Sequence, residues 1–128
     1  MRSRCAEFGR ADTVTIAAAT KLGIDPAGLY GFLGRVPDAL QETGRLFVLA
    51  DPAGHGRRWI EPLRGAFARD DFFSYRDVGD VMLGGRKVVR LKGSGDEWGL
   101  ALYAAGPAVY TVSALDGKTA ARIIAALP

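Results

Sequence analysis

The chain has 128 residues, of which 48% are hydrophobic and 24% charged, a composition typical of one globular domain spanning 1–128. Its 17 Lys and Arg residues against 14 Asp and Glu residues give a net charge of +3, which permits an anionic partner without requiring one. One cysteine excludes an internal disulfide, and without a membrane span or signal peptide we expect a soluble, cytoplasmic protein, although an exported domain lacking its signal would look the same.

The first third of the chain predicts helices. Residues 1–11 have little periodicity, so we expect a flexible arm. A helix is predicted over 12–22, ended by Gly23 in a left-handed conformation. Asp25-Pro26 has the pattern of an N-cap and first residue of a second helix, and 37–42 has that of one further helical turn.

Part of this region resembles a known DNA-binding motif. Residues 18–40, AATKLGIDPAGLYGFLGRVPDAL, resemble the helix-turn-helix of the tetracycline-repressor family of transcription regulators, through Leu22-Gly23-Ile24, Pro26, Leu29-Tyr30 and Gly34. The resemblance implies DNA binding through 18–35. Glycines stand where a recognition helix needs polar side chains that reach base edges. We therefore favour the alternative, two short packing helices joined at a glycine.

The middle of the chain predicts a strand, a turn and a helix. Four consecutive apolar residues over 46–49 favour a central strand that is covered on both faces. Asp51-Pro52-Ala53-Gly54 has the residue order of a type I turn. Trp59, Leu63 and Phe67 have helical spacing, which predicts a helix over 59–68.

The loop between that turn and that helix is a candidate anion site. His55, Arg57 and Arg58 precede a helix, and backbone N–H groups together with two guanidinium groups could hold a small anion or a phosphate ester. The alternative is an exposed turn with solvated arginines, which we favour. His55 is the one histidine of the chain, which excludes a histidine metal cluster, and we expect no metal or cofactor.

The segment 77–127 predicts a β-meander. Gly84-Gly85 between strand-forming residues predicts a two-residue hairpin in which Val81 faces Val88 and Asp77 faces Lys92. Further strands are predicted over 98–103 and 110–113, before a helix over 118–127 capped by Asp116. We expect a single core, built from Val78, Val89, Leu91, Leu100, Leu102, Tyr110, Val112, Ile123, Ile124 and Leu127.

The other face of this hairpin is the candidate interaction surface. It carries Arg86, Val88 and Arg90, with Tyr103 on the next strand, a mixture of cations and apolar side chains that interfaces favour. We expect a protein partner or self-association there, with nucleic acid as a weaker alternative. Asp96-Glu97 are paired carboxylates that could serve acid–base chemistry, but in a Gly-Ser-Gly loop a solubilising role is favoured.

Residues 77–128 also resemble uncharacterised small α+β domains of high-GC bacteria, through GGRKVVRL, WGLALYAAG, AVYTVSAL and IIAALP. This resemblance implies a fold and no activity. We therefore predict an α+β fold in which N-terminal helices precede an antiparallel-dominated sheet of about five strands, with helices 59–68 and 118–127 packed mainly on one face. Because no polar constellation converges, a non-catalytic binding or structural module is favoured over an enzyme, DNA binding is the alternative, and the anion site comes third.

Overall fold

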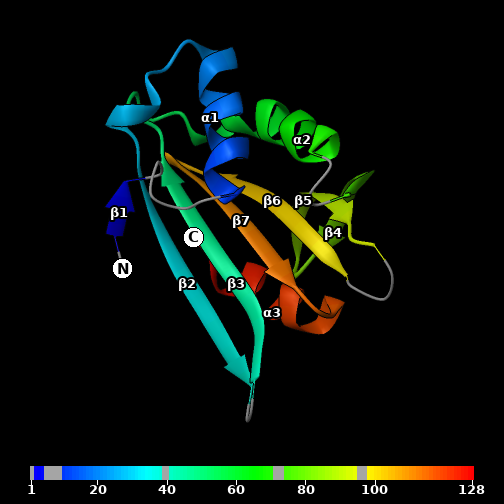
Figure 1. Ribbon diagram of the computed structural model, residues 1–128. Helices are drawn as coiled ribbons and strands as arrows, with labels where there is room; N and C mark the ends of the chain where they lie inside the picture. Colours follow the sequence, from blue (N-terminus) through cyan, green and yellow to red (C-terminus); the bar gives the residue numbers. More distant parts are fainter. Residues whose placement is uncertain (1, 5–9, 39–40, 71–73, 95–97) are drawn as a thin grey trace.

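In the part of the chain that the structure describes, one antiparallel sheet and three α-helices make up the fold (Figure 1). The computed structural model describes residues 2–4, 10–38, 41–70, 74–94 and 98–128. The sheet has seven strands in the order β1-β2-β3-β7-β6-β5-β4, namely β1 (Arg2–Arg4), β2 (Tyr30–Asp38), β3 (Gln41–Ala50), β4 (Arg76–Leu83), β5 (Arg86–Lys92), β6 (Gly99–Ala105) and β7 (Ala108–Ala114). The helices are α1 (Arg10–Leu22), α2 (Ile60–Arg69) and α3 (Gly117–Ala126). The α+β class and the antiparallel sheet are confirmed, and the sheet exceeds the expected five strands.

The additional strands come from the N-terminal region. Arg2–Arg4 pairs with β2, so this part of the predicted arm belongs to the sheet. Pro26–Gly28 forms a single 3-10 turn, capped by the Asp25 carboxylate, which accepts from the Ala27 N–H at 3.0 Å. From Tyr30 the chain is extended, and the predicted second helix is wrong, as is the helical turn over 37–42, of which 39–40 lie outside the described residues.

Pairing with β3 explains why this segment is a strand. Glycines weaken a helix by about 1 kcal/mol each, and three of them fall at positions 28, 31 and 34. The antiparallel register with β3 runs from Gly31 opposite Leu49 to Val36 opposite Gly44, which satisfies the backbone groups that a helix would otherwise pair. Residues 30–38 are therefore a strand where the resembled helix-turn-helix would have its recognition helix.

The first helix, α1, ends at the predicted position. Gly23 has a φ of +73°, and the Ile24 N–H donates to the Ala19 carbonyl at 2.9 Å, which closes the C-terminus of α1. The helix begins at Arg10, two residues before the expected Asp12.

The sheet separates two cores. Leu49, Leu91, Leu100 and Val109 pack with side chains of α1 and α2 on one face. On the other face, α3 packs on a second set, Val88, Ala101, Tyr110 and Val112. The predicted single core is therefore wrong: α1 and α2 share one face, whereas α3 covers the opposite one (Figure 1).

Consecutive valines on β5 show why two helical layers are needed. Val88 is 2% exposed and Val89 is 6% exposed, although their side chains point to opposite faces. A strand that is apolar on both faces needs cover on both. Val78, which was expected in the core with Val89, lies on the edge strand β4 and is exposed, as is Met82 on the same strand.

The predicted hairpin register is confirmed from Leu83 opposite Arg86 to Gly79 opposite Arg90. Beyond Gly79, whose φ is +98°, a bulge shifts the pairing, so Asp77 stands opposite Leu91 rather than Lys92. Asp77 instead accepts two hydrogen bonds from Arg64 of α2, from Nε at 2.5 Å and from Nη2 at 3.1 Å. Hydrogen bonding from Arg64 lowers the pKa of Asp77, and the pair fastens α2 to the edge of the sheet.

The α3 layer makes a stability prediction. Ile124 is fully buried, so Ile124→Ala should lower the free energy of unfolding by about 2–5 kcal/mol through the cavity it leaves. Urea denaturation measures this change. The control Leu115→Ala, at a side chain that is 47% exposed, should cost less than about 1 kcal/mol. Equal losses for the two variants would contradict the assignment of α3 as a core helix.

Candidate functional site

The residues after β3 are organised by one carboxylate. The predicted turn at 51–54 is confirmed, because the Gly54 N–H donates to the Asp51 carbonyl at 3.0 Å. The Asp51 side chain folds back over this turn, and its Oδ1 accepts the backbone N–H groups of Ala53 at 2.7 Å and His55 at 3.3 Å. Its Oδ2 accepts from Arg58 Nε at 2.5 Å and from Trp59 Nε1 at 2.6 Å.

These contacts use two of the donors of the predicted anion site. His55, Arg57 and Arg58 are exposed, as their alternative interpretation required. The donors expected to hold an external anion, however, include the His55 N–H and the Arg58 guanidinium, and both bind Asp51. The loop therefore holds a carboxylate that belongs to the chain itself.

Hydrogen bonding also controls the ionisation of Asp51. Burial by itself would raise the pKa of this carboxyl, but the bonds from Arg58, Trp59 and the loop backbone outweigh burial and lower the pKa from 3.8 to about 2. Asp51 is therefore ionised at neutral pH. Its side chain is fully covered, so the charge is compensated by the loop rather than by water.

The loop over 51–58, which we call the Asp51 loop, holds the N-terminus of α2 against the β6–β7 turn. The Asp51 N–H donates to Pro107 O at 2.8 Å and the Gly56 N–H to Gly106 O at 3.0 Å. A Cβ at position 56 would stand 2.2 Å from the Ala108 carbonyl oxygen, so only glycine permits this approach. Trp59, fully buried, then leads directly into α2.

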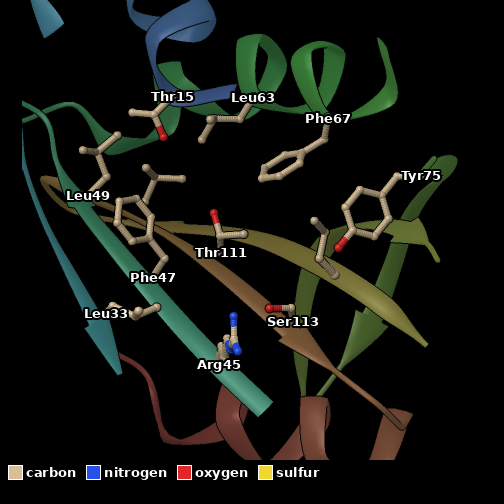
Figure 2. Close-up of a pocket in the computed structure, with 12 residues that line it drawn as sticks. Thr15, Leu33, Arg45, Phe47, Leu49, Leu63, Phe67, Tyr75, Thr111 and Ser113 are labelled. Atoms are coloured by element: carbon tan, nitrogen blue, oxygen red, sulfur yellow. The ribbon is translucent and has the colours of Figure 1, made fainter. Parts of the chain in front are cut away.

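A cavity of about 210 Å³ lies between this helical layer and the sheet. Most of its walls are apolar side chains from β2, β3, β6, β7 and α2, with Tyr75 preceding β4 and Thr15 on α1 (Figure 2). The lining comprises Thr15, Leu33, Arg45, Phe47, Leu49, Leu63, Phe67, Tyr75, Leu100, Val109, Thr111 and Ser113. We call this cavity the helix-side pocket.

Polar groups gather on the sheet side of the helix-side pocket. Arg45 on β3 stands directly opposite Ser113 on β7, and Phe47 stands opposite Thr111. Figure 2 shows the guanidinium of Arg45 and the hydroxyl groups of Thr111 and Ser113 along this floor. Within the described part of the chain, neither hydroxyl has a hydrogen-bond partner, whereas Arg45 and Tyr75 each have a further interaction.

A second, more polar cavity of about 440 Å³ lies beside the start of α2. Its charged side chains include Glu61, Asp80 and Lys87. Lys87 pairs with Asp80 at 3.3 Å, and Arg64 pairs with Glu61 at 3.3 Å. These three charges are matched within the chain, but Arg57 also lines this cavity. We place the candidate site in the helix-side pocket because its lining is mostly apolar.

The structure buries part of the predicted interaction surface. Val88 is buried against α3, and Arg86 donates from Nη1 to the Tyr103 hydroxyl at 3.2 Å while lying 5.2 Å from its ring centre. Arg90 lies 4.6 Å from the ring centre of Trp98. These side chains contact one another, and Val88 is covered within the chain. Binding of a partner through Arg86, Arg90 and Tyr103 stays a prediction. Asp96 and Glu97 lie outside the described residues.

The residues of the helix-side pocket were missed by sequence reasoning. Thr111 and Ser113 alternate with Tyr110 and Val112, the pattern of a strand whose polar side faces solvent. Nothing in that alternation shows that helices cover the polar side. The available signal was the run over 46–49, which predicted cover on both faces of β3. That prediction is confirmed, because Leu46 and Val48 pack on the α3 side and Phe47 and Leu49 on the other.

The fold and the pocket together define an α+β protein with an antiparallel sheet, helices on both faces and a cavity beneath one helical layer. Comparison with protein-family models, with curated proteins and with solved structures finds no match. Among the described residues, no helix has the length and apolar character needed to cross a membrane.

The depressed pKa of Asp51 makes an acid-stability prediction. The stabilisation is complete above the unfolded-state pKa of about 4 and is lost as pH falls toward the folded-state value of about 2. Asp51→Asn should therefore cost roughly 2–3 kcal/mol at pH 7 and should weaken the dependence of stability on pH between 4 and 2. Thermal unfolding across that range measures it. Asp80→Asn, at an exposed carboxylate, should retain the wild-type profile, and a wild-type profile for Asp51→Asn would refute the assignment.

Proposed function

We propose that this protein is a non-catalytic binding module that holds a small, mainly apolar molecule in the helix-side pocket. The observation that carries the proposal is the cavity of about 210 Å³ lined mostly by apolar side chains. Protein interiors are close-packed and rarely leave voids larger than a water molecule. An apolar cavity of about 150 Å³ is enough to take up benzene.

The lining chemistry favours binding over catalysis. Among the lining residues that the structure describes, none is a carboxylate, an imidazole or a thiol. The Ser113 hydroxyl is a weak nucleophile unless a neighbouring base removes its proton, and its cross-strand neighbour Arg45 offers hydrogen-bond donors and no acceptor. The pocket therefore supplies shape, apolar contact and hydrogen bonding.

Titration with a neutral hydrocarbon tests the proposal. Ethylbenzene should produce saturable chemical-shift changes in the backbone and side-chain signals of Phe47, Leu63 and Val109, which line the helix-side pocket. Signals of Ile123 and Ile124, on the opposite face, should stay in place. Absence of saturable changes up to the solubility limit of ethylbenzene would refute the proposed function.

A pocket-filling variant provides the matched comparison. Thr111→Phe places a ring on the floor of the helix-side pocket, and it should reduce ethylbenzene affinity at least tenfold because the ring occupies the space of the ligand. Thr13→Phe makes the same change at an exposed position of α1 and should bind as the wild type does. Equal affinity of both variants would place the ligand elsewhere.

A further inference from the structure

The helix-side pocket is chemically asymmetric. Its helix side presents Leu63 and Phe67, whereas its sheet side carries a cation and two hydroxyl groups (Figure 2). An apolar ligand alone would leave the Thr111 and Ser113 hydroxyl groups without a partner once it displaced water from them, which costs free energy. The asymmetry therefore favours a ligand with one apolar end and one polar end.

The polar groups lie close enough together to bind one group of atoms. Arg45 and Ser113 form a directly opposed cross-strand pair, a relation that puts Cβ atoms about 5 Å apart. Thr111 precedes Ser113 by two residues on the same face of β7, which adds a step of roughly 7 Å along the strand. Hydroxyl donors and a guanidinium at such spacing surround a volume the size of a carboxylate.

We propose that the ligand of the helix-side pocket is a small apolar carboxylic acid, bound as its carboxylate by Arg45 and by the Ser113 hydroxyl, with Thr111 at the inner edge. This inference rests on the proposed function, because it specifies the class of ligand for the same pocket. Arginine suits the role because its planar guanidinium matches a carboxylate with two parallel hydrogen bonds. Arg45 also has another interaction within the chain, which the ligand carboxylate shares or displaces.

The cavity volume limits the size of the acid. At about 210 Å³ the pocket exceeds the roughly 150 Å³ that accommodates benzene, but it falls below the 300–1,000 Å³ of sites for drug-sized ligands. An acid of about ten non-hydrogen atoms, such as one aromatic ring with a short chain, fits this range. A long-chain fatty acid does not.

The position of Arg45 sets the strength of the charge preference. Its side chain is exposed, so solvent weakens the attraction relative to a buried pair. A hydrogen bond to a charged group nonetheless adds enough to favour a carboxylate over an equally large neutral group by about 10- to 100-fold in affinity. Raising the salt concentration should reduce that preference.

Calorimetric titration with two isosteric probes tests the inference. The probes are 3-phenylpropionate and 3-phenylpropan-1-ol, which share the ring and chain and differ in charge. Wild-type protein should bind the acid at least tenfold more tightly than the alcohol. Arg45→Gln should abolish this difference in affinity and change the affinity for the alcohol less than twofold. The control Arg122→Gln makes the same change on α3, at the opposite face of the sheet, and should keep the difference. Ser113→Ala should weaken acid binding about 3- to 10-fold.

The outcomes separate this inference from the proposed function. Equal affinities of the acid and the alcohol for the wild type would overturn the carboxylate assignment and leave the apolar pocket in place. Saturable binding of neither probe, together with the absence of ethylbenzene binding, would overturn both. Retention of the acid preference in both Arg45→Gln and Ser113→Ala, with circular dichroism unchanged, would also overturn the assignment, because the carboxylate would then bind elsewhere.

Discussion

The hydrogen bonds to the Asp51 carboxylate are the interaction on which the position of α2 depends. A buried carboxylate is costly unless hydrogen bonds replace its water, and here four donors do so, from Ala53, His55, Arg58 and Trp59. These bonds join the end of β3 to the start of α2. The same loop is fixed to the β6–β7 turn through backbone hydrogen bonds. These bonds fix the distance between α2 and the sheet. That distance in turn leaves room for the helix-side pocket.

Two-sided burial of the sheet is the second constraint. Because β5, β6 and β7 bury apolar side chains on both faces, the sheet forms an internal wall between α3 and the α1–α2 pair. Figure 1 shows that β2 and β3 extend beyond α1 and α2. Where this helical cover ends, polar side chains replace apolar ones on the sheet, and Arg45 and Ser113 lie in that transition. The polar end of the pocket is thus a consequence of helices that are shorter than the strands beneath them.

This arrangement also gives two cationic side chains of β5 a role within the fold. Arg86 and Arg90 lie over the aromatic rings of Tyr103 and Trp98, where cation–π attraction and apolar contact hold them in the α3 layer. Their charge therefore contributes to packing. Arg45, in contrast, lies on the opposite face of the sheet, beside an apolar cavity and two hydroxyl groups. The face of the sheet that an arginine occupies therefore decides whether it packs on an aromatic ring or lines the pocket.

Local sequence signals determined the elements whose structure depends on nearby residues. Gly84-Gly85 fixed the hairpin turn, Asp116 capped α3 through its bond to the Thr119 N–H at 2.7 Å, and helical spacing located α2, because turns, caps and amphipathic helices are set within a few residues. Only the tertiary structure decided that 30–38 is a strand, since its backbone pairs with β3. It also decided which face each helix covers and that Arg45 meets Thr111 and Ser113 in one pocket. Arg45 lies more than sixty positions from both of these residues, and no local pattern encodes a relation over such a distance.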